Sequence, residues 1–425
     1  MKWTGVAALA IAAASLIVPW RAGRDAAGID LFQFWAGAQL ARDMPSLYAV
    51  ETRVGQYAPF QQRAYERDHS ERLLIAARLR GEFEFYSTPF LYTAFGVLPS
   101  RYDAALLVYR VLSLAAFAAG MLLLARAAGL GWTAAALLLA FAATLFEPLK
   151  SEMRVVNVNC VQLFVIALAV WLARDDERWK SIAAGALLAL VTAFKPNLLF
   201  IVPLLLLARF AARDWARLIN ETLGAALGAI IAIVSSAVYF RGLHAWIEWI
   251  ARARSLATAL LPLREGNVAP ALPLANAFGI RGTLLLTIVL VIAAAVAIIR
   301  GRGNASPVLI AGVALLIYLL SATLVWLHYL VLALPVAIAL VADVPLRRGL
   351  ALFALTLVGL DLYLYVFRVR FETTQAALLW TGLALLFATS LWRLSVRTVS
   401  PYAASEPADE RSRRASPTRP ARPKR

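Results

Sequence analysis

Four short polar segments of the sequence carry residue types that can act in proton transfer or in stabilising an anion. They are AAGIDLFQFW (26–35) with Asp30, EMRVVNVNC (152–160) with Arg154, Asn157 and Asn159, AFKPNLLF (193–200) with Lys195, and LVWLHYLV (324–331) with His328. A carboxylate within hydrogen-bond reach of a hydroxyl group can act as a general base. Lys, His and Arg side chains can stabilise the negative charge that develops on a leaving group.

Each of these residues also fits an ordinary structural role. Asp30 fits the N-cap of the helix that GIDLFQFW predicts, and Lys195 can extend its long side chain to the membrane interface. His328, which stands among aromatic residues, fits an aromatic belt. Asn157 and Asn159 can satisfy backbone groups where a helix begins. None of these signals is specific for function by itself.

The elements that must position these residues belong to a membrane protein. The chain has 425 residues, of which 61% are hydrophobic and 16% are charged, and its mean hydropathy is +0.72. Soluble domains are about half apolar and about a quarter charged. The net charge of +17 comes from Lys and Arg between apolar runs and in the tail, which indicates topology signals and no nucleic-acid partner.

The sequence lacks the common signatures of bound cofactors. Cys160 is the single cysteine, which excludes an internal disulfide framework and a Cys-rich metal site. A Gly-rich phosphate loop and a dinucleotide-binding fingerprint are both missing from the sequence. We therefore expect neither a cofactor nor a metal.

Apolar runs bounded by basic residues predict an all-α polytopic integral membrane protein with about twelve transmembrane helices. The predicted spans are residues 3–20, 103–125, 131–147, 159–173, 181–195, 197–211, 218–240, 281–300, 306–324, 327–342, 349–367 and 376–393. The first run could instead be a cleaved signal peptide, but no small-residue cleavage site stands cleanly before Arg21, which favours a retained helix.

Basic residues between the spans predict the orientation. If the N-terminus is cytoplasmic, every inner connection contains at least one basic residue, whereas the outer connections are less uniformly basic. Both termini are therefore predicted to be cytoplasmic. The expected location is the bacterial inner (plasma) membrane.

Two outer segments are predicted to lie at the membrane surface. Residues 21–102 form a long first extracytoplasmic loop that we expect to carry interfacial helices, with helical character at 61–81. Within it, residues 85–99 indicate an interfacial or re-entrant piece, in which Tyr86, Phe90 and Tyr92 can sit at headgroup level. The second segment, residues 241–256, places Trp246, Trp249, Ile250 and Ala253 on one face, as in a helix lying on the membrane.

The chain divides into a membrane domain (1–395) and a charged, Pro-rich tail (396–425) that we expect to be a disordered basic cytoplasmic segment. Within the membrane domain, Arg110 and Asp361 fall inside predicted spans. Buried charges are costly, so we expect each to be paired or to face a watery cavity, with a structural ion pair favoured over a catalytic role.

The predicted topology brings the four polar segments together. Asp30, the segment 152–160, Lys195 and His328 are all expected at one depth near the outer membrane face, although they are far apart in the sequence. Polar residues gathered at one side of a membrane domain indicate a functional site.

Taken in order, these segments resemble glycosyltransferase family 87 (the DUF2029 group) over about residues 28–340. The first family segment has an Asp, an aromatic pair and a downstream Leu-Tyr, which IDLFQFWAGAQLARDMPSLY (29–48) matches with Asp30, Phe34/Trp35 and Leu47/Tyr48. The second family segment usually reads Tyr-x-Pro-Pro, and FYSTPF (85–90) is close to it. The last usually reads Trp-x-His-His/Tyr, which WLHY (326–329) matches. One departure occurs at VNVN (156–159): the family commonly has Gly-Gln-x-Asn, so only Asn159 is kept and Asn157 replaces Gln.

The resemblance implies a GT-C-type membrane transferase that takes a hexose, best associated with mannose, from a polyprenyl-phosphate-linked donor. It also implies that Asp30 is the catalytic base. Lys195, His328 and Arg154 are then candidates for stabilising the leaving phosphate, and the other expected substrate contacts are Asn157, Asn159, Tyr86 and Trp35. A direct displacement with one base would invert the anomeric centre without requiring a metal. The acceptor would be a glycan or glycolipid hydroxyl, and desolvation of Asp30 among aromatic residues would raise its basicity.

Two other classes of protein are also compatible with the sequence. A polytopic secondary transporter or a lipid-linked substrate flippase also has many spans and intramembrane charges, but no internal repeat is evident between the halves of this chain. A non-catalytic membrane scaffold would leave the outer polar cluster without a role. The long first outer loop and the clustering favour an enzyme that works at the membrane surface.

Overall fold

The computed structural model describes residues 2–44, 46–257, 267–366 and 373–396, and within these it is helical. The described residues contain no strand, and one isolated β-bridge pairs Asn267 with Trp326. The predicted tail lies outside the described residues except for Val396.

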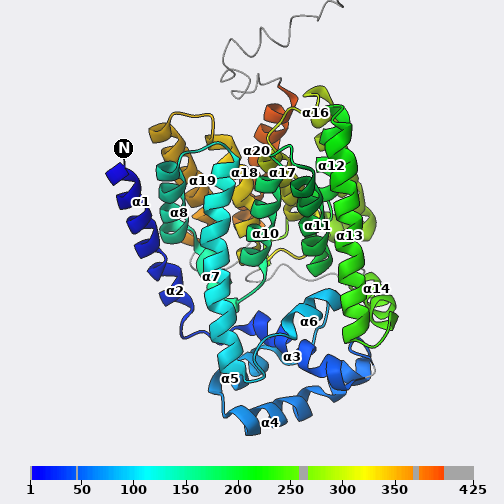
Figure 1. The fold of residues 1–425 in the computed structure, drawn as a ribbon. Coiled ribbons are helices and arrows are strands. Elements are labelled where there is room, and N and C mark those ends of the chain that lie inside the picture. The colour runs from blue at the N-terminus through cyan, green and yellow to red at the C-terminus, as the bar shows by residue number, and fades with distance from the viewer. Residues whose placement is uncertain (1, 45, 258–266, 367–372, 397–425) are drawn as a thin grey trace, which may run out of the picture.

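Seven helical segments precede the main bundle. They are α1 (Lys2–Ser15), α2 (Ile17–Gly23), α3 (Ile29–Asp43), the π-helix η1 (Glu51–Gly55), α4 (Tyr57–Asp68), α5 (Glu71–Arg80) and α6 (Pro89–Phe95). The first two pack along α8 and α9, whereas α3 to α6 gather beyond one end of the bundle. We call this second group the α3–α6 layer (Figure 1).

The remaining helices form the bundle and its connections. They are α7 (Tyr102–Ala127), α8 (Trp132–Leu145), α9 (Glu147–Val155), α10 (Asn159–Leu172), α11 (Arg178–Phe194), the 3-10 helix η2 (Pro196–Leu198), α12 (Ile201–Ala211), α13 (Trp215–Tyr239), α14 (His244–Ala257), α15 (Leu272–Phe278), α16 (Ile280–Arg300), α17 (Pro307–Ser321), the 3-10 helix η3 (Leu327–Ala333), α18 (Leu334–Val341), α19 (Leu346–Val366) and α20 (Thr373–Ser395). These elements overlap all of the predicted apolar ranges.

Helix length and composition give a smaller number of membrane spans than the sequence predicts. Among the described residues, five helical stretches are long and apolar enough to cross a membrane: Thr4–Gly23, Tyr102–Ala127, Trp215–Tyr239, Ile280–Arg300 and Ala377–Ser395. A sixth is added if α8 and α9, which meet at a bend of 69°, count as one broken span. The chain is therefore an all-α membrane protein, while the predicted count of about twelve spans is not confirmed.

The two ends of the bundle differ in construction (Figure 1). The start of α1 and the end of α20 lie at one end, whereas the α3–α6 layer covers the other. The lower ends of α7 and α13 reach into that layer, where α13 packs against α6. This arrangement places one helical layer against the polar ends of the bundle helices.

The link before α3 fixes the position of that helix. Gly28 caps α3 in a left-handed conformation with φ of 72°, and the Tyr102 hydroxyl donates to the carbonyls of Ala27 and Gly28 at 2.7 and 2.9 Å. The N-cap is therefore Gly28, and the prediction that Asp30 caps this helix is wrong. Asp30 lies in the first turn, where the helix dipole favours a negative charge.

We expect Gly28→Ala to destabilise the protein by about 2–4 kcal/mol. An alanine in left-handed backbone is strained, and its Cβ would lie 2.5 Å from Leu106 Cδ1. Gly55→Ala is the matched control, because nothing lies within 4 Å of an added Cβ there. Unfolding of both variants in detergent measures the difference, and equal stabilities would contradict the role of Gly28.

The structure refines three other expectations for the predicted surface segments. The helical character predicted for 61–81 is confirmed and is divided between α4 and α5, because the chain turns at His69 and Ser70 caps α5 through Leu73 N. Tyr92 is 1% exposed and packs against Phe85, so its ring contacts protein and not lipid headgroups. On α14, the Trp249 indole donates to the Tyr86 carbonyl at 3.1 Å, so this aromatic residue faces the protein.

Arg110 and Asp361 each bind backbone groups through part of the side chain, while Arg110 Nε and Asp361 Oδ1 are buried without a hydrogen-bond partner among the described residues. Arg110 donates to the carbonyls of Arg24 and Ala26 at 3.2 and 2.9 Å, and Asp361 accepts from the Glu147 amide at 2.8 Å. The favoured expectation of a structural ion pair is therefore wrong for these contacts. Arg110 instead holds the link between α2 and α3, and Asp361 holds the start of α9.

Candidate functional site

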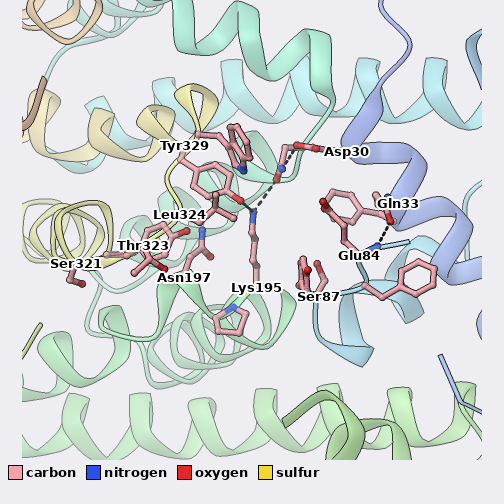
Figure 2. Close-up of a pocket in the computed structure, with 18 of the residues that line it drawn as sticks. Asp30, Gln33, Glu84, Ser87, Lys195, Asn197, Ser321, Thr323, Leu324 and Tyr329 are labelled. Atoms are coloured by element: carbon pink, nitrogen blue, oxygen red, sulfur yellow. Dashed lines mark hydrogen bonds between the residues drawn. The ribbon is translucent and has the colours of Figure 1, made fainter. Parts of the chain in front are cut away.

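A cavity of about 410 Å³ lies between the α3–α6 layer and the ends of the bundle helices (Figure 2). The layer contributes α3, the end of α5 and the segment that leads into α6. The bundle contributes the α9–α10 link, the residues after α11, the start of α16 and the α17–η3 link. The polar lining residues are Asp30, Gln33, Arg80, Glu84, Tyr86, Ser87, Tyr92, Asn157, Lys195, Asn197, Thr283, Tyr318, Ser321, Thr323, Trp326 and Tyr329.

Asp30 is fixed at the cavity wall by two partners. Its Oδ1 forms a salt bridge with Arg80, and its Oδ2 accepts a hydrogen bond from Asn157 Nδ2 at 2.6 Å. The carboxyl group is 9% exposed, so it is largely desolvated while still lining the cavity. The Arg80 guanidinium places a positive charge directly beside this largely desolvated carboxylate.

Lys195 lies in the link between α11 and η2, and its ammonium group joins the same network (Figure 2). Its Nζ donates to Asn157 Oδ1 at 3.2 Å and to the Tyr329 hydroxyl at 3.0 Å. Asn157 therefore connects the carboxylate of Asp30 to the ammonium of Lys195. Thr88 in the FYSTPF segment donates to the carbonyls of Ala193 and Phe194, which holds that segment beside Lys195.

Burial lowers the pKa of Lys195 to about 7. The negative charge of Glu152 opposes this effect, and the positive charge of Arg80 adds to it. Lys195 is half-buried, and among the residues that the structure describes no carboxylate forms a salt bridge with it, so its ammonium group is suited to receive an anionic ligand.

His328 is the fourth residue of the network and contacts Asp30 and Asn157 without lining the cavity. Its Nε2 lies 3.3 Å from Asp30 Oδ2 and 3.2 Å from Asn157 Nδ2, and which of these contacts is a hydrogen bond depends on the tautomer. The residue is 5% exposed and its ring packs edge-on against Tyr329. Asp30, Asn157, Lys195 and His328 therefore meet in space, as the predicted topology requires.

The other predicted site residues lie elsewhere, apart from Tyr86, which lines the cavity. Arg154 is half-exposed, binds Glu147 Oε1 at 2.8 Å and does not line the cavity. The Trp35 indole is buried and donates to the Pro99 carbonyl at 3.0 Å, so it anchors the layer. Asn159 is buried beneath the cavity, where its Nδ2 donates to Glu152 Oε2 at 2.9 Å.

Arg80, Gln33 and Glu84 are site residues that the sequence did not reveal. Arg80 also donates to Glu84 Oε2 at 2.9 Å and to the Ile29 carbonyl at 3.1 Å. Gln33 bridges the carbonyl of Glu82 and the amide of Glu84 at 2.8 and 3.1 Å. Arg80 is one of several arginines in the charged stretch 61–81, and only the turn at Gly81 and the packing of α5 against α3 select it.

The site has no obvious arrangement for a metal ion. Among the residues that the structure describes, no group of three or more His, Cys, Asp or Glu side chains is placed to hold one.

The comparisons with known proteins identify the family. The family model for glycosyltransferase family 87 matches residues 87–322, more than half of the chain. The chain belongs to glycosyltransferase family 87. It is accordingly a membrane glycosyltransferase. No curated protein and no solved structure matches the chain.

The family match covers part of the site. Asn157 and Lys195 lie within the matched residues of this glycosyltransferase, whereas Asp30, Arg80 and His328 lie outside them. The functional assignment of these three therefore depends on the geometry of the cavity and on the motif order in the sequence.

Proposed function

We propose that this glycosyltransferase moves a hexose, mannose in the first instance, from a polyprenyl-phosphate-linked donor to a hydroxyl group of a glycan or glycolipid. The observation that carries the proposal is the cavity in which Asp30 and Lys195 are joined through Asn157. One end of this network can accept a proton, and the other can bind an anion.

The proposed reaction is a single displacement with inversion. The acceptor oxygen bonds to the anomeric carbon, its proton passes to Asp30 Oδ, and the bond from the anomeric carbon to the phosphate oxygen breaks. The bonding electrons leave with the polyprenyl phosphate. No step is assigned to a metal ion.

Lys195 is the proposed partner of the leaving phosphate. Its ammonium lines the cavity, and Tyr329 supplies a hydroxyl donor 3.0 Å away. His328 and Arg80 both contact Asp30, which suits them to orient the base rather than to bind the phosphate. Arg154 has no proposed part, because its guanidinium lies outside the cavity.

We also propose that the cavity opens on the extracytoplasmic face of a bacterial inner membrane, with both termini in the cytoplasm. Two features support this orientation. The basic connections predicted to be inside alternate with the polar segments that build the cavity. The start of α1 and the end of α20 lie at the end of the bundle opposite the α3–α6 layer (Figure 1).

Transfer assays with reconstituted protein test the proposed function. Proteoliposomes containing the full chain receive radiolabelled polyprenyl-phosphate-mannose together with lipid extracts as acceptors. The expected result is a labelled glycan or glycolipid product whose anomeric configuration is inverted relative to the donor. Solute counterflow or donor translocation without any transfer product would overturn the proposal and favour a transporter or flippase.

Donor binding should weaken as the pH rises above neutrality. Lys195 is protonated below its pKa of about 7 and loses its charge above it, while a bound anion moves this transition to higher pH. A phosphonate analogue of the donor keeps a constant charge in this range, so its dissociation constant should rise by up to about tenfold per pH unit above the transition. Calorimetric titration in nanodiscs from pH 6 to 9 measures this. Lys195→Arg stays charged and should show no such transition, and identical pH profiles for the two proteins would contradict the assignment.

A further inference from the structure

Glu152 is a fully buried carboxylate directly behind the site. It stands near the end of α9 and is 0% exposed. Its Oε1 accepts from the amides of Asn159 and Cys160 at 2.9 and 3.4 Å, and its Oε2 accepts from Asn159 Nδ2 at 2.9 Å. Every one of these partners is an uncharged N–H donor, so both carboxyl oxygens act as acceptors. Complete burial raises the pKa of the Glu152 carboxyl, whereas the positive charges of His328 and Lys195 and the donors on Asn159 and Cys160 lower it.

These bonds fix the link that carries Asn157. α9 ends at Val155, Val156 has a φ of 58°, and α10 begins at Asn159. Glu152 spans this link by capping the first amides of α10 from the preceding helix. The same Asn159 Nδ2 lies 3.4 Å from the His328 carbonyl oxygen. Glu152 therefore constrains two of the three residues that contact Asp30, namely Asn157 and His328.

A cap alone does not require a charge here. A serine or an asparagine caps a helix without placing an ionised group in a buried position, and a buried charge is costly. The groups that act on the Lys195 ammonium give the charge a second role. The positive charge of Arg80 on α5 disfavours the protonated form of Lys195, and the negative charge of Glu152 on α9 favours it. Asn157 and Tyr329 contact it through neutral oxygen atoms, while Asp30 and His328 lie on the far side of Asn157.

We propose that Glu152 is a positioning residue that fixes the α9–α10 link and supplies the buried negative charge that balances the Lys195 ammonium. The proposal deepens the proposed function and rests on it, because Lys195 is the residue assigned to the donor phosphate. Glu152 touches neither substrate in this scheme and acts through Asn157 and Lys195.

Reactivity of Lys195 tests the charge directly and needs no donor. The full chain in nanodiscs is labelled with trace acetic anhydride from pH 5 to 10, and acetylation of each lysine is read by mass spectrometry. Glu152→Gln should lower the midpoint for Lys195 by on the order of one pH unit. Lys180, at the start of α11 and bound to Asp175, is the internal reference, and its reactivity at each pH should be the same in both proteins.

A second variant separates charge from folding. Glu152→Asp keeps the carboxylate but shortens its reach to the α10 amides, so it should lower the stability while leaving the Lys195 midpoint near that of the natural protein. An unchanged midpoint in Glu152→Gln, or equal midpoint shifts in both variants, would overturn the proposal.

Donor binding then distinguishes the failure of this inference from the failure of the proposed function. Glu152→Gln should weaken binding of the phosphonate donor analogue several-fold at pH 7 and move its pH transition to lower pH. When Glu152→Gln is added to the Lys195→Arg variant, the pH dependence of donor-analogue binding should not change, because the guanidinium stays charged. A shifted Lys195 midpoint without any donor binding by the natural protein would retain the electrostatic coupling but refute the donor site. Donor binding with an unshifted transition would refute the role of Glu152 alone.

Discussion

Asp30→Asn should lower the rate of sugar transfer by about 10²–10⁴-fold, the usual contribution of a general base. The amide has nearly the size and shape of the carboxyl group and can keep a contact with Asn157, so the protein should still fold. Because the amide cannot take the proton from the acceptor hydroxyl, kcat should fall. The dissociation constant of the donor analogue should change by only a few-fold. Initial rates with polyprenyl-phosphate-mannose, together with analogue binding, measure both quantities.

Asp43→Asn is the matched control for this substitution. Asp43 ends the same helix and is exposed, so the control removes an equal charge from α3 at a distance from the cavity. It should retain the rate of the natural protein. Full activity in Asp30→Asn would eliminate Asp30 as the base, whatever the control shows.

Arg80→Gln should have the second largest effect, acting on both stability and rate. Removing the guanidinium leaves the Asp30 carboxylate 9% exposed without its cation. Breaking a buried ion pair from one side costs about 3–5 kcal/mol, and the partial exposure of Arg80 places the expected loss at the lower end, about 3 kcal/mol. Because Arg80 also holds the Ile29 carbonyl and Glu84, a misplaced base should lower kcat by about 10²-fold.

Arg78→Gln on the same helix provides the comparison, because Arg78 is exposed. Its stability should change by about 0.5 kcal/mol or less. Arg80→Lys should recover part of the stability but less of the rate, since an ammonium cannot reproduce the planar geometry of the guanidinium. Thermal unfolding in detergent and transfer rates measure these effects. If Arg80→Gln behaved like Arg78→Gln, the salt bridge would have no part in the site.

The sequence was sufficient to locate the helices but not to settle how they relate to the membrane. Apolar runs mark burial in lipid and burial in protein equally, so α10, α12 and α17 are found as helices although each is too short to be a span by length. The break between α8 and α9 arises at Phe146 and Pro148, where backbone geometry rather than hydropathy bends the chain by 69°. The pattern of apolar residues also could not predict turns such as those at His69 and Gly28, where the backbone adopts a positive φ.

For the site, the sequence identified residues that stand out from an apolar background. Asp30, Asn157, Lys195 and His328 were recognisable because polar groups are rare in such segments and because the family motif orders them. Arg80 and Glu84 come from a stretch rich in charge, where a functional residue looks like its neighbours. Glu152 and Arg154 are two positions apart on α9, and the helix rotation alone sends one into the core and the other outward. The residue predicted from the sequence as a site residue was Arg154, which points outward.

The most direct test is a structure of the full chain in nanodiscs with the phosphonate donor analogue bound. We expect the phosphonate to lie in the cavity of about 410 Å³, within hydrogen-bond distance of Lys195 Nζ and the Tyr329 hydroxyl. We also expect the anomeric carbon to face Asp30, with room between them for one acceptor hydroxyl. A phosphonate bound near Arg154 or elsewhere on the surface, with this cavity left empty, would contradict both expectations.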